Sequence, residues 1–187
     1  FLTLNKTKDL VGYTTKFRED PIYLDPRHKD LGARLIINLE KLHLSLKLLA
    51  LKPVDKDEYY SISSKLGIPQ INTDELQNNL FGIECNLDEL NGIDFKKGCY
   101  VGQENTARIK LKDKLSKRLL PIEVIGGYLS KDNIILHENT QIGKVLISNK
   151  FPFAIIKFKD KNFEFEKIFK CGTASIRIKK PNWFKFD

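Results

Sequence analysis

Cys99 lies in a short segment whose neighbouring residues could activate its thiol. The sequence there reads Lys96-Lys97-Gly98-Cys99-Tyr100-Val101-Gly102-Gln103-Glu104. Its two glycines predict a tight loop, since glycine permits a positive φ or a close backbone approach at each end. Gln103 and Glu104 predict the start of a short helix that runs through Arg108, because an acidic side chain suits the first turn of a helix.

Two features of this segment lower the pKa of a thiol, namely the lysines on one side and the helix N-terminus on the other. They favour the thiolate of Cys99, which is the nucleophilic and metal-binding form. The residues leave an alternative open, because a free cysteine is commonly a small buried side chain that only fills space. The segment therefore predicts either a reactive thiol or a structural cysteine.

The other chemistry-bearing residues match none of the common motifs. Cys85 and Cys171 are widely spaced and no Cys-x-x-Cys pair occurs, so a zinc ribbon or a ferredoxin-type cluster site within one chain is not predicted. The three histidines form no His-Glu-x-x-His pair, and neither a Walker loop nor a Gly-x-Gly-x-x-Gly is present. We expect Cys85 and Cys171 to be ordinary packing residues.

The composition indicates a folded chain. Of 187 residues, 41% are hydrophobic and 30% are charged, which excludes a disordered tail and a disulfide-stapled miniprotein. The longest apolar runs are a few residues, whereas a membrane-spanning helix needs about 20, and the start of the chain lacks the apolar core of a secretory signal. We expect a soluble, intracellular protein. Because the sequence has no methionine and opens on Phe1, we also expect a processed or truncated piece.

The net charge of +8 is compatible with a surface that attracts anions. However, 26 of the 32 basic residues are lysines and 6 are arginines, beside 20 isoleucines and 13 asparagines. Lysine, isoleucine and asparagine have A/T-rich codons, so part of the basicity reflects codon usage. This argues against sequence-specific recognition of nucleic acid.

The first third of the chain reads as mixed α and β. Residues 33–38 form a branched apolar run, and leucines alternate with polar residues over 42–48, which predicts a half-buried strand. Asp55 followed by Glu58 predicts the start of a helix over 56–66, and Gly67 predicts its end. A further helical turn is expected over 74–79.

The last third reads as a small antiparallel barrel or sandwich, because short β-prone runs alternate with turn residues. These runs are Ile122–Ile125, Asn133–Leu136, Lys144–Ser148, Ala154–Phe158 and Ser175–Ile178. We place the domain boundary between residues 116 and 117, so that residues 1–116 form a mixed α/β region and 117–187 a β-barrel. Trp183 is expected to close the base of the barrel as a core residue.

The octapeptide from Lys97 to Glu104 resembles the Lys-Gly-Cys-Tyr-x-Gly-Gln-Glu hallmark of the YgfZ family. These are folate-binding proteins of iron–sulfur cluster maintenance, related to the aminomethyltransferase, or T-protein, of the glycine cleavage system. The resemblance extends to further stretches of this sequence: Asp25-Pro26-Arg27 with Arg34, Leu66-Gly67-Ile68-Pro69, Asn86-Leu87-Asp88, and Arg118 with Pro121. Gly82-Ile83-Glu84 keeps the acid but not the proline of the family's Pro-x-Glu.

The resemblance implies an α+β protein, with a mixed α/β middle lobe of the T-protein-like folate-binding fold followed by a small antiparallel β-barrel. It also implies that the family's N-terminal portion is missing. The expected cofactor is tetrahydrofolate, with the candidate cofactor-binding residues Glu84, Lys97, Gly98, Tyr100, Gly102, Gln103, Glu104 and Arg108. Cys99 is the candidate functional thiol, and no resident metal is expected.

The implied function is assembly or repair of iron–sulfur clusters, especially [4Fe–4S], with indirect effects on iron–sulfur enzymes that include tRNA-modifying ones. The implied partners are cluster-assembly proteins and client enzymes, in the cytoplasm or, for a eukaryote, the mitochondrial matrix. Two alternatives stay open at this point. One is a folate-dependent aminomethyl or one-carbon transferase, which turnover of aminomethylated lipoyl protein would reveal. The other is an RNA-binding module built on the basic run 110–118, which steeply salt-dependent tRNA binding would reveal.

Overall fold

The computed structural model of the chain describes residues 11–98, 101, 103–111, 115–158 and 163–184. The chain divides into two compact units, residues 1–59 and 60–187, and the division falls within one helix, α2 (Lys56–Lys65). In the described part of the chain, every helix is too short or too polar to cross a lipid bilayer.

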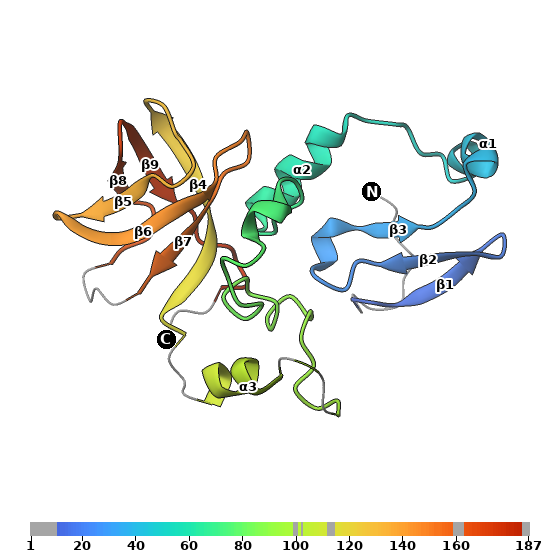
Figure 1. The fold of residues 1–187 in the computed structure, drawn as a ribbon. Helices are drawn as coiled ribbons and strands as arrows, with labels where there is room; N and C mark the ends of the chain where they lie inside the picture. Colours follow the sequence, from blue (N-terminus) through green and yellow to red (C-terminus); the bar gives the residue numbers. More distant parts are fainter. Residues whose placement is uncertain (1–10, 99–100, 102, 112–114, 159–162, 185–187) are drawn as a thin grey trace. The chain divides into compact units, whose positions relative to one another are not determined.

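A three-stranded antiparallel sheet forms the first unit, drawn in blue in Figure 1. Its strands β1 (Thr14–Phe17), β2 (Asp20–Leu24) and β3 (Ala33–Leu35) lie in that order. Arg18 and Glu19 both have a positive φ and make the two-residue turn between β1 and β2. Between β2 and β3 lies the short 3-10 helix η1 (Lys29–Leu31).

The prediction of a strand over 42–48 is wrong, because these residues form the helix α1 (Leu42–Leu48). A 3-10 turn, η2 (Leu39–Lys41), leads into it, and the Asn38 side chain accepts a hydrogen bond from the Glu40 amide at 3.0 Å. Leucine is a strong helix former, and the segment 39–48 contains no β-branched residue. The alternating leucines therefore do not share one face, and Leu44 and Leu48 are exposed.

The prediction of a helix over 56–66 is confirmed by α2. The Asp55 carboxylate accepts a hydrogen bond from the Asp57 amide at 2.8 Å, which caps the first turn. Gly67 ends the helix with a φ of +73°. The chain then runs through turns and the 3-10 helix η3 (Thr73–Leu76), close to the helical turn predicted over 74–79, and reaches the helix α3 (Gln103–Leu111).

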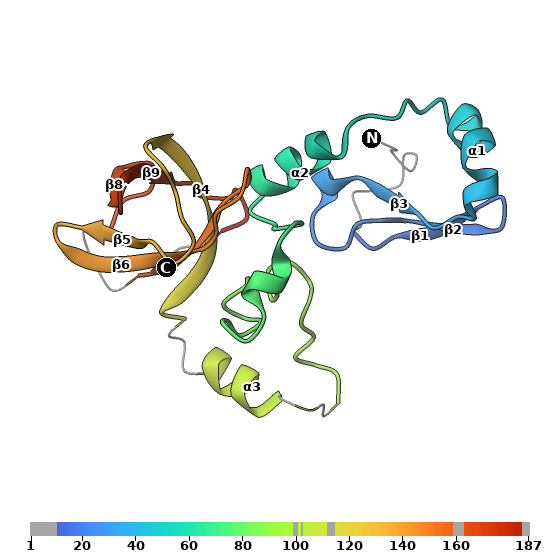
Figure 2. The ribbon, with the colours of Figure 1, turned by 45° about the horizontal axis from the view of Figure 1, so that its top comes forward.

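The predicted antiparallel barrel is present. It consists of β4 (Lys117–Gly126), β5 (Ile134–His137), β6 (Thr140–Ile147), β7 (Phe153–Lys157), β8 (Ile168–Cys171) and β9 (Ala174–Ile178), in the closed order β4-β7-β6-β5-β8-β9. In Figure 2, these strands surround a common interior. The sequence patterns do not predict β8, a four-residue strand that a two-residue turn at Gly172 joins to β9. The domain boundary at 116/117 stays a prediction.

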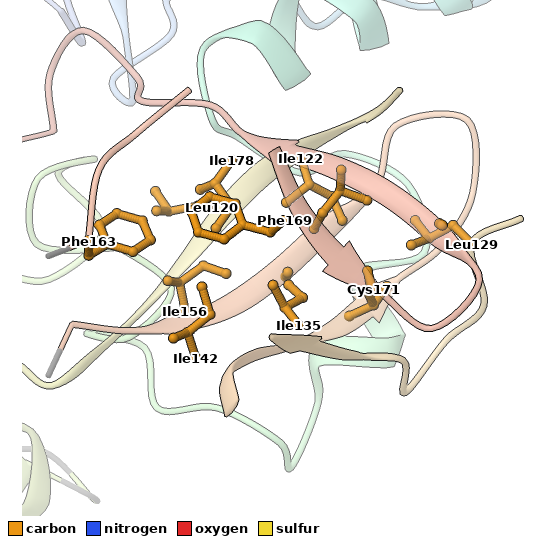
Figure 3. Close-up of a cluster of buried hydrophobic side chains, with 14 of the residues drawn as sticks. Leu120, Ile122, Leu129, Ile135, Ile142, Ile156, Phe163, Phe169, Cys171 and Ile178 are labelled. Carbon is orange, nitrogen blue, oxygen red and sulfur yellow. The ribbon is translucent and has the colours of Figure 1, made fainter. Parts of the chain in front are cut away.

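Apolar side chains from every strand fill the barrel. Figure 3 shows Leu120 and Ile122 of β4, Ile156 of β7 and Phe169 of β8 pointing into one cluster. Phe163 stacks on Phe169, with ring centroids 5.8 Å apart. Such burial supplies most of the free energy that holds a small barrel together.

Trp183 packs against this core, as predicted, and it also holds the end of α2. Its indole Nε1 donates a hydrogen bond to the carbonyl oxygen of Leu66 at 2.6 Å. A Cβ on Gly67 would lie 2.4 Å from Cγ of Pro181 and 3.2 Å from the Trp183 ring. The close approach and the positive φ both require glycine at position 67.

We predict that Gly67→Ala lowers the free energy of unfolding by about 1–3 kcal/mol, because the methyl group clashes with Pro181 and the backbone is strained. Urea denaturation measures the loss as a lower midpoint. Gly126→Ala is the matched control, since among the described residues beyond its chain neighbours no atom lies within 4 Å of a Cβ at that position. Equal midpoints for the two variants would contradict the prediction.

Candidate functional site

The thiol segment is described on both sides of Cys99, while Cys99, Tyr100 and Gly102 lie outside the described residues. The predicted helix after the loop is present, since α3 begins at Gln103. Lys96 and Lys97 are exposed, and the Val101 side chain is fully exposed, at 103%. The described flanks of the segment therefore face solvent.

Gly98 does not have a positive φ, which is one of the two possibilities that the sequence predicts for it. Among the described residues, and apart from its chain neighbours, no atom lies within 4 Å of the place where a Cβ would stand.

Glu104 and Arg108 meet each other on α3. They form an ion pair one helical turn apart, with side-chain exposures of 75% and 66%. Such exposed pairs stabilise a helix by a few tenths of a kcal/mol. Gln103, the first residue of the helix, is half-buried.

Glu84 is more enclosed, with 14% of its side chain exposed. Its Oε2 accepts a hydrogen bond from the Phe81 amide at 3.0 Å, and its Oε1 lies 4.0 Å from Nζ of Lys117. The candidate carboxylates Glu84 and Glu104 thus each have partners within the protein.

Sequence reasoning missed a polar cluster that residues 86–89 form. We call this cluster the 86–89 hub. Three side chains of the hub, Asn86, Asp88 and Glu89, contact cations from two other elements. Arg118 of β4 donates from Nε to Oδ1 of Asn86 at 2.5 Å and pairs with Glu89. Lys110 of α3 pairs with Asp88. The available signal in the sequence was Arg118 itself, because arginine is scarce among the basic residues of this lysine-rich chain.

The hub also bears on the RNA-binding alternative. Three cations of the basic run 110–118 are described, and all have acidic partners: Lys110 has Asp88, Lys117 has Glu84, and Arg118 has Glu89. Arg118 is buried, at 9% exposure. Burial withholds Arg118 from phosphate, which needs accessible cations, whereas Lys110 and Lys117 are about half exposed.

The first unit carries a second polar cluster, around Asp25, which is 1% exposed. Arg27 donates from Nη2 to Asp25 Oδ2 at 2.7 Å, and Arg34 donates from Nε to the same oxygen at 2.6 Å. Burial raises the pKa of Asp25, but the hydrogen bonds from the two arginines outweigh it and lower this pKa to about 2. Tyr59 accepts a hydrogen bond from Arg34 at 2.8 Å. The cluster is a paired, buried charge network.

The other two cysteines are protected. Cys171 is 0% exposed in the barrel core, and burial raises its pKa to about 11. Cys85 packs against Leu119 and its neighbours, and burial together with the charge of Glu84 raises its pKa to about 11. Among the described residues, no group of three or more His, Cys, Asp or Glu side chains could hold a metal ion.

Comparison with known proteins identifies relatives of the chain. It is 36% identical over 102 residues to "Iron-sulfur cluster assembly factor IBA57 homolog, mitochondrial" of Dictyostelium discoideum, a match covering 54% of this chain and 25% of that protein. The chain is a distant homologue of IBA57. The Neurospora crassa IBA57 homologue is 38% identical over 97 residues, which are 52% of this chain and 22% of that protein.

The IBA57 homologue of Pyricularia oryzae is 35% identical over 124 residues, which cover 66% of this chain and 30% of that protein. The match thus spans about a quarter of the length of these curated relatives. None of the family models compared with the chain matches it. The relationship to IBA57 agrees with the YgfZ-type octapeptide around Cys99, since IBA57 is the eukaryotic member of that family.

We predict that Asp25 makes this IBA57 homologue lose stability in acid. Because its pKa is about 2 when folded and about 3.8 when unfolded, its contribution of about 2 kcal/mol is present above pH 4 and is lost as the pH falls from 4 to 2. Urea denaturation across this pH range measures the loss. Asp25→Asn should show a shallower pH dependence than the unsubstituted chain, and identical slopes would contradict the assignment.

We further predict that Cys85 and Cys171 resist labelling in the native protein at pH 7.5, because the pKa of each thiol is raised to about 11 and Cys171 is buried while Cys85 is half-buried. Maleimide treatment followed by peptide mass spectrometry reads each cysteine separately. In urea both should label fully, which serves as the control. Fast native labelling of either one would show that its thiol is accessible.

Proposed function

We propose that the chain acts in the assembly or repair of iron–sulfur clusters, with Cys99 as the thiol that contacts the cluster. The homology to IBA57 carries this proposal, because the names of the relatives state that they are iron–sulfur cluster assembly factors. The octapeptide from Lys97 to Glu104 supports it, since in the sequence Cys99 follows Lys97 and precedes the first residue of α3, Gln103. Both features favour the thiolate that iron binds.

The cluster is cargo that more than one molecule must hold. One thiolate cannot ligate a cluster alone, and the pKa of Cys85 and the pKa of Cys171 are both raised to about 11 in packed surroundings. The remaining ligands must therefore come from another protein, a second copy or a small thiol. We propose cluster-assembly proteins as these partners and [4Fe–4S] enzymes as the clients, with indirect effects on those that modify tRNA.

We predict that Cys99→Ser abolishes function while the fold stays intact. In cells that lack their own IBA57 homologue, the unsubstituted chain should restore the activity of a [4Fe–4S] enzyme and Cys99→Ser should not. Cys85→Ser is the control and should retain function. Restoration by Cys99→Ser would remove the thiol from the mechanism, and no restoration by the unsubstituted chain would overturn the proposed function for this chain.

Tetrahydrofolate is the cofactor that the family resemblance implies, and the described residues test its fit. A pterin presents adjacent N–H donors to a buried carboxylate. Glu104 is exposed and paired with Arg108, and Glu84 accepts from its own turn. Neither carboxylate fits that requirement as it stands, so no step of the proposed function passes through folate. The T-protein-like folate-binding fold of residues 1–116 stays part of the proposal.

We therefore predict that this chain alone binds tetrahydrofolate with a Kd weaker than about 1 mM, which corresponds to less than about 4 kcal/mol of binding free energy. Isothermal titration calorimetry measures it directly. Micromolar binding that Glu84→Gln weakens would show that Glu84 leaves its turn to accept the pterin, and would contradict this prediction.

A further inference from the structure

Arg34 of β3 is a second cation on a carboxylate that already has one. Arg27 contacts both oxygens of Asp25, since its Nε donates to Oδ1 at 3.0 Å and its Nη2 donates to Oδ2 at 2.7 Å. This two-point pairing satisfies a carboxylate both in charge and in geometry. Arg34 adds a third donor, from its Nε to Oδ2 at 2.6 Å. Two guanidinium groups therefore share one buried carboxylate.

The largest ion-pair network of the barrel is balanced by comparison. Two cations meet two acids there, and each acid contacts both cations; the residues are Glu123, Glu166, Arg177 and Lys179. In the part of the chain that the structure describes, Arg34 has Asp25 as its single acidic partner. Since Arg27 alone neutralises that carboxylate, the charge of Arg34 is left for another anion.

The guanidinium group of Arg34 is also held in a defined orientation. Its Nη2 donates to the hydroxyl oxygen of Tyr59 at 2.8 Å, and its Cζ lies 6.0 Å from the centre of the Tyr59 ring. Tyr59 is the last residue of the first unit, so all these contacts lie within that unit. A side chain that is already fixed loses little conformational entropy when it binds a ligand.

The same guanidinium group remains accessible. Of the Arg34 side chain, 41% is exposed. Nε and Nη2 are the donors that bind Asp25 and Tyr59, and Nη1 makes no hydrogen bond to any residue that the structure describes. Nη1 carries two hydrogens, so it can donate to a molecule that approaches from solvent.

We propose that Arg34 forms a binding site for an oxyanion, the carboxylate or phosphate group of a ligand. Nη1 donates to the anion, while Asp25 and Tyr59 hold the guanidinium plane in place. Planar guanidinium groups match the oxygens of both kinds of anion. A bound anion also balances the cluster, with two negative charges against two positive ones. The inference does not depend on the proposed role in iron–sulfur cluster assembly.

The test is an NMR titration of the native chain that follows the Nε–H signals of its arginines. The chain has six arginines, and the Nε–H groups of Arg27 and Arg34 donate to the same carboxylate. Sodium phosphate and sodium acetate are added separately, with sodium chloride keeping the ionic strength constant. We expect both signals to shift with a saturable curve and a Kd of about 10 mM or tighter for at least one anion. The tighter anion tells a phosphate ligand from a carboxylate ligand.

Arg34→Gln removes the second guanidinium group and leaves Asp25 paired with Arg27, so we expect it to fold. The Arg27 signal should then show a Kd at least tenfold weaker. Arg177→Gln is the matched control, because it removes an arginine from the balanced barrel network, and it should keep the Kd of the unsubstituted chain.

Two results would overturn the proposal. One is the absence of a saturable shift for both anions in the unsubstituted chain, and the other is an unchanged Kd in folded Arg34→Gln. If Arg34→Gln does not fold, the Arg34 signal of the unsubstituted chain decides, since only binding at this side chain shifts it more than the other arginine signals. The restoration of enzyme activity in cells tests the cluster role separately and leaves this titration unaffected.

Discussion

Closure of the barrel through β4 is the constraint on which the second unit depends. The first half of this strand, Lys117 to Pro121, pairs with β7, and the second half, Ile122 to Gly126, pairs with β9. One strand thus joins both ends of the sheet, and no edge remains open among its strands. Pro121, which has no amide hydrogen, lies where the partner changes, a position at which a missing donor is tolerated. Because Arg118 and Leu119 belong to this strand and contact Asn86, the closed barrel determines where the 86–89 hub lies.

Arginines supply donors to the buried polar groups Asp25 and Asn86. Arg27 and Arg34 hold Asp25, and Arg118 holds Asn86 and Glu89. Many lysine ion pairs, such as that of Lys16 with Glu19, lie at the surface, where a flexible ammonium suffices. A buried carboxylate needs directional donors, which the guanidinium supplies in a fixed plane. Arg108 and Arg177 form ion pairs that are at least partly exposed, so arginine in this chain is not confined to buried polar groups.

The sequence predicts the elements that local patterns determine. The cap at Asp55, the glycine at 67 and the alternating barrel runs each specify their structure within a few residues. The prediction of a strand over 42–48 is wrong because leucines at every second position are also compatible with a helix. Asn38, which caps the 3-10 turn before this helix, lies outside the alternating leucine pattern. β8 is missed because four residues give too little alternation to recognise. The octapeptide predicts the relationship to IBA57, because eight residues with two glycines, a cysteine and a Gln-Glu pair are hard to obtain by chance.

The contacts of the 86–89 hub could not be predicted from local sequence patterns, for a physical reason. Asn86 and Arg118 are 32 residues apart, and their contact exists only after the barrel has closed. Apolar burial is non-directional, so the barrel core supplies stability without fixing where a neighbouring loop lies. Hydrogen bonds to charged groups are directional, and an unpaired partner left in a buried place is costly. The hydrogen bonds of Asn86 to Arg118 and to the Leu119 carbonyl oxygen therefore fix where residues 86–89 lie on the barrel, which apolar burial alone would leave unspecified.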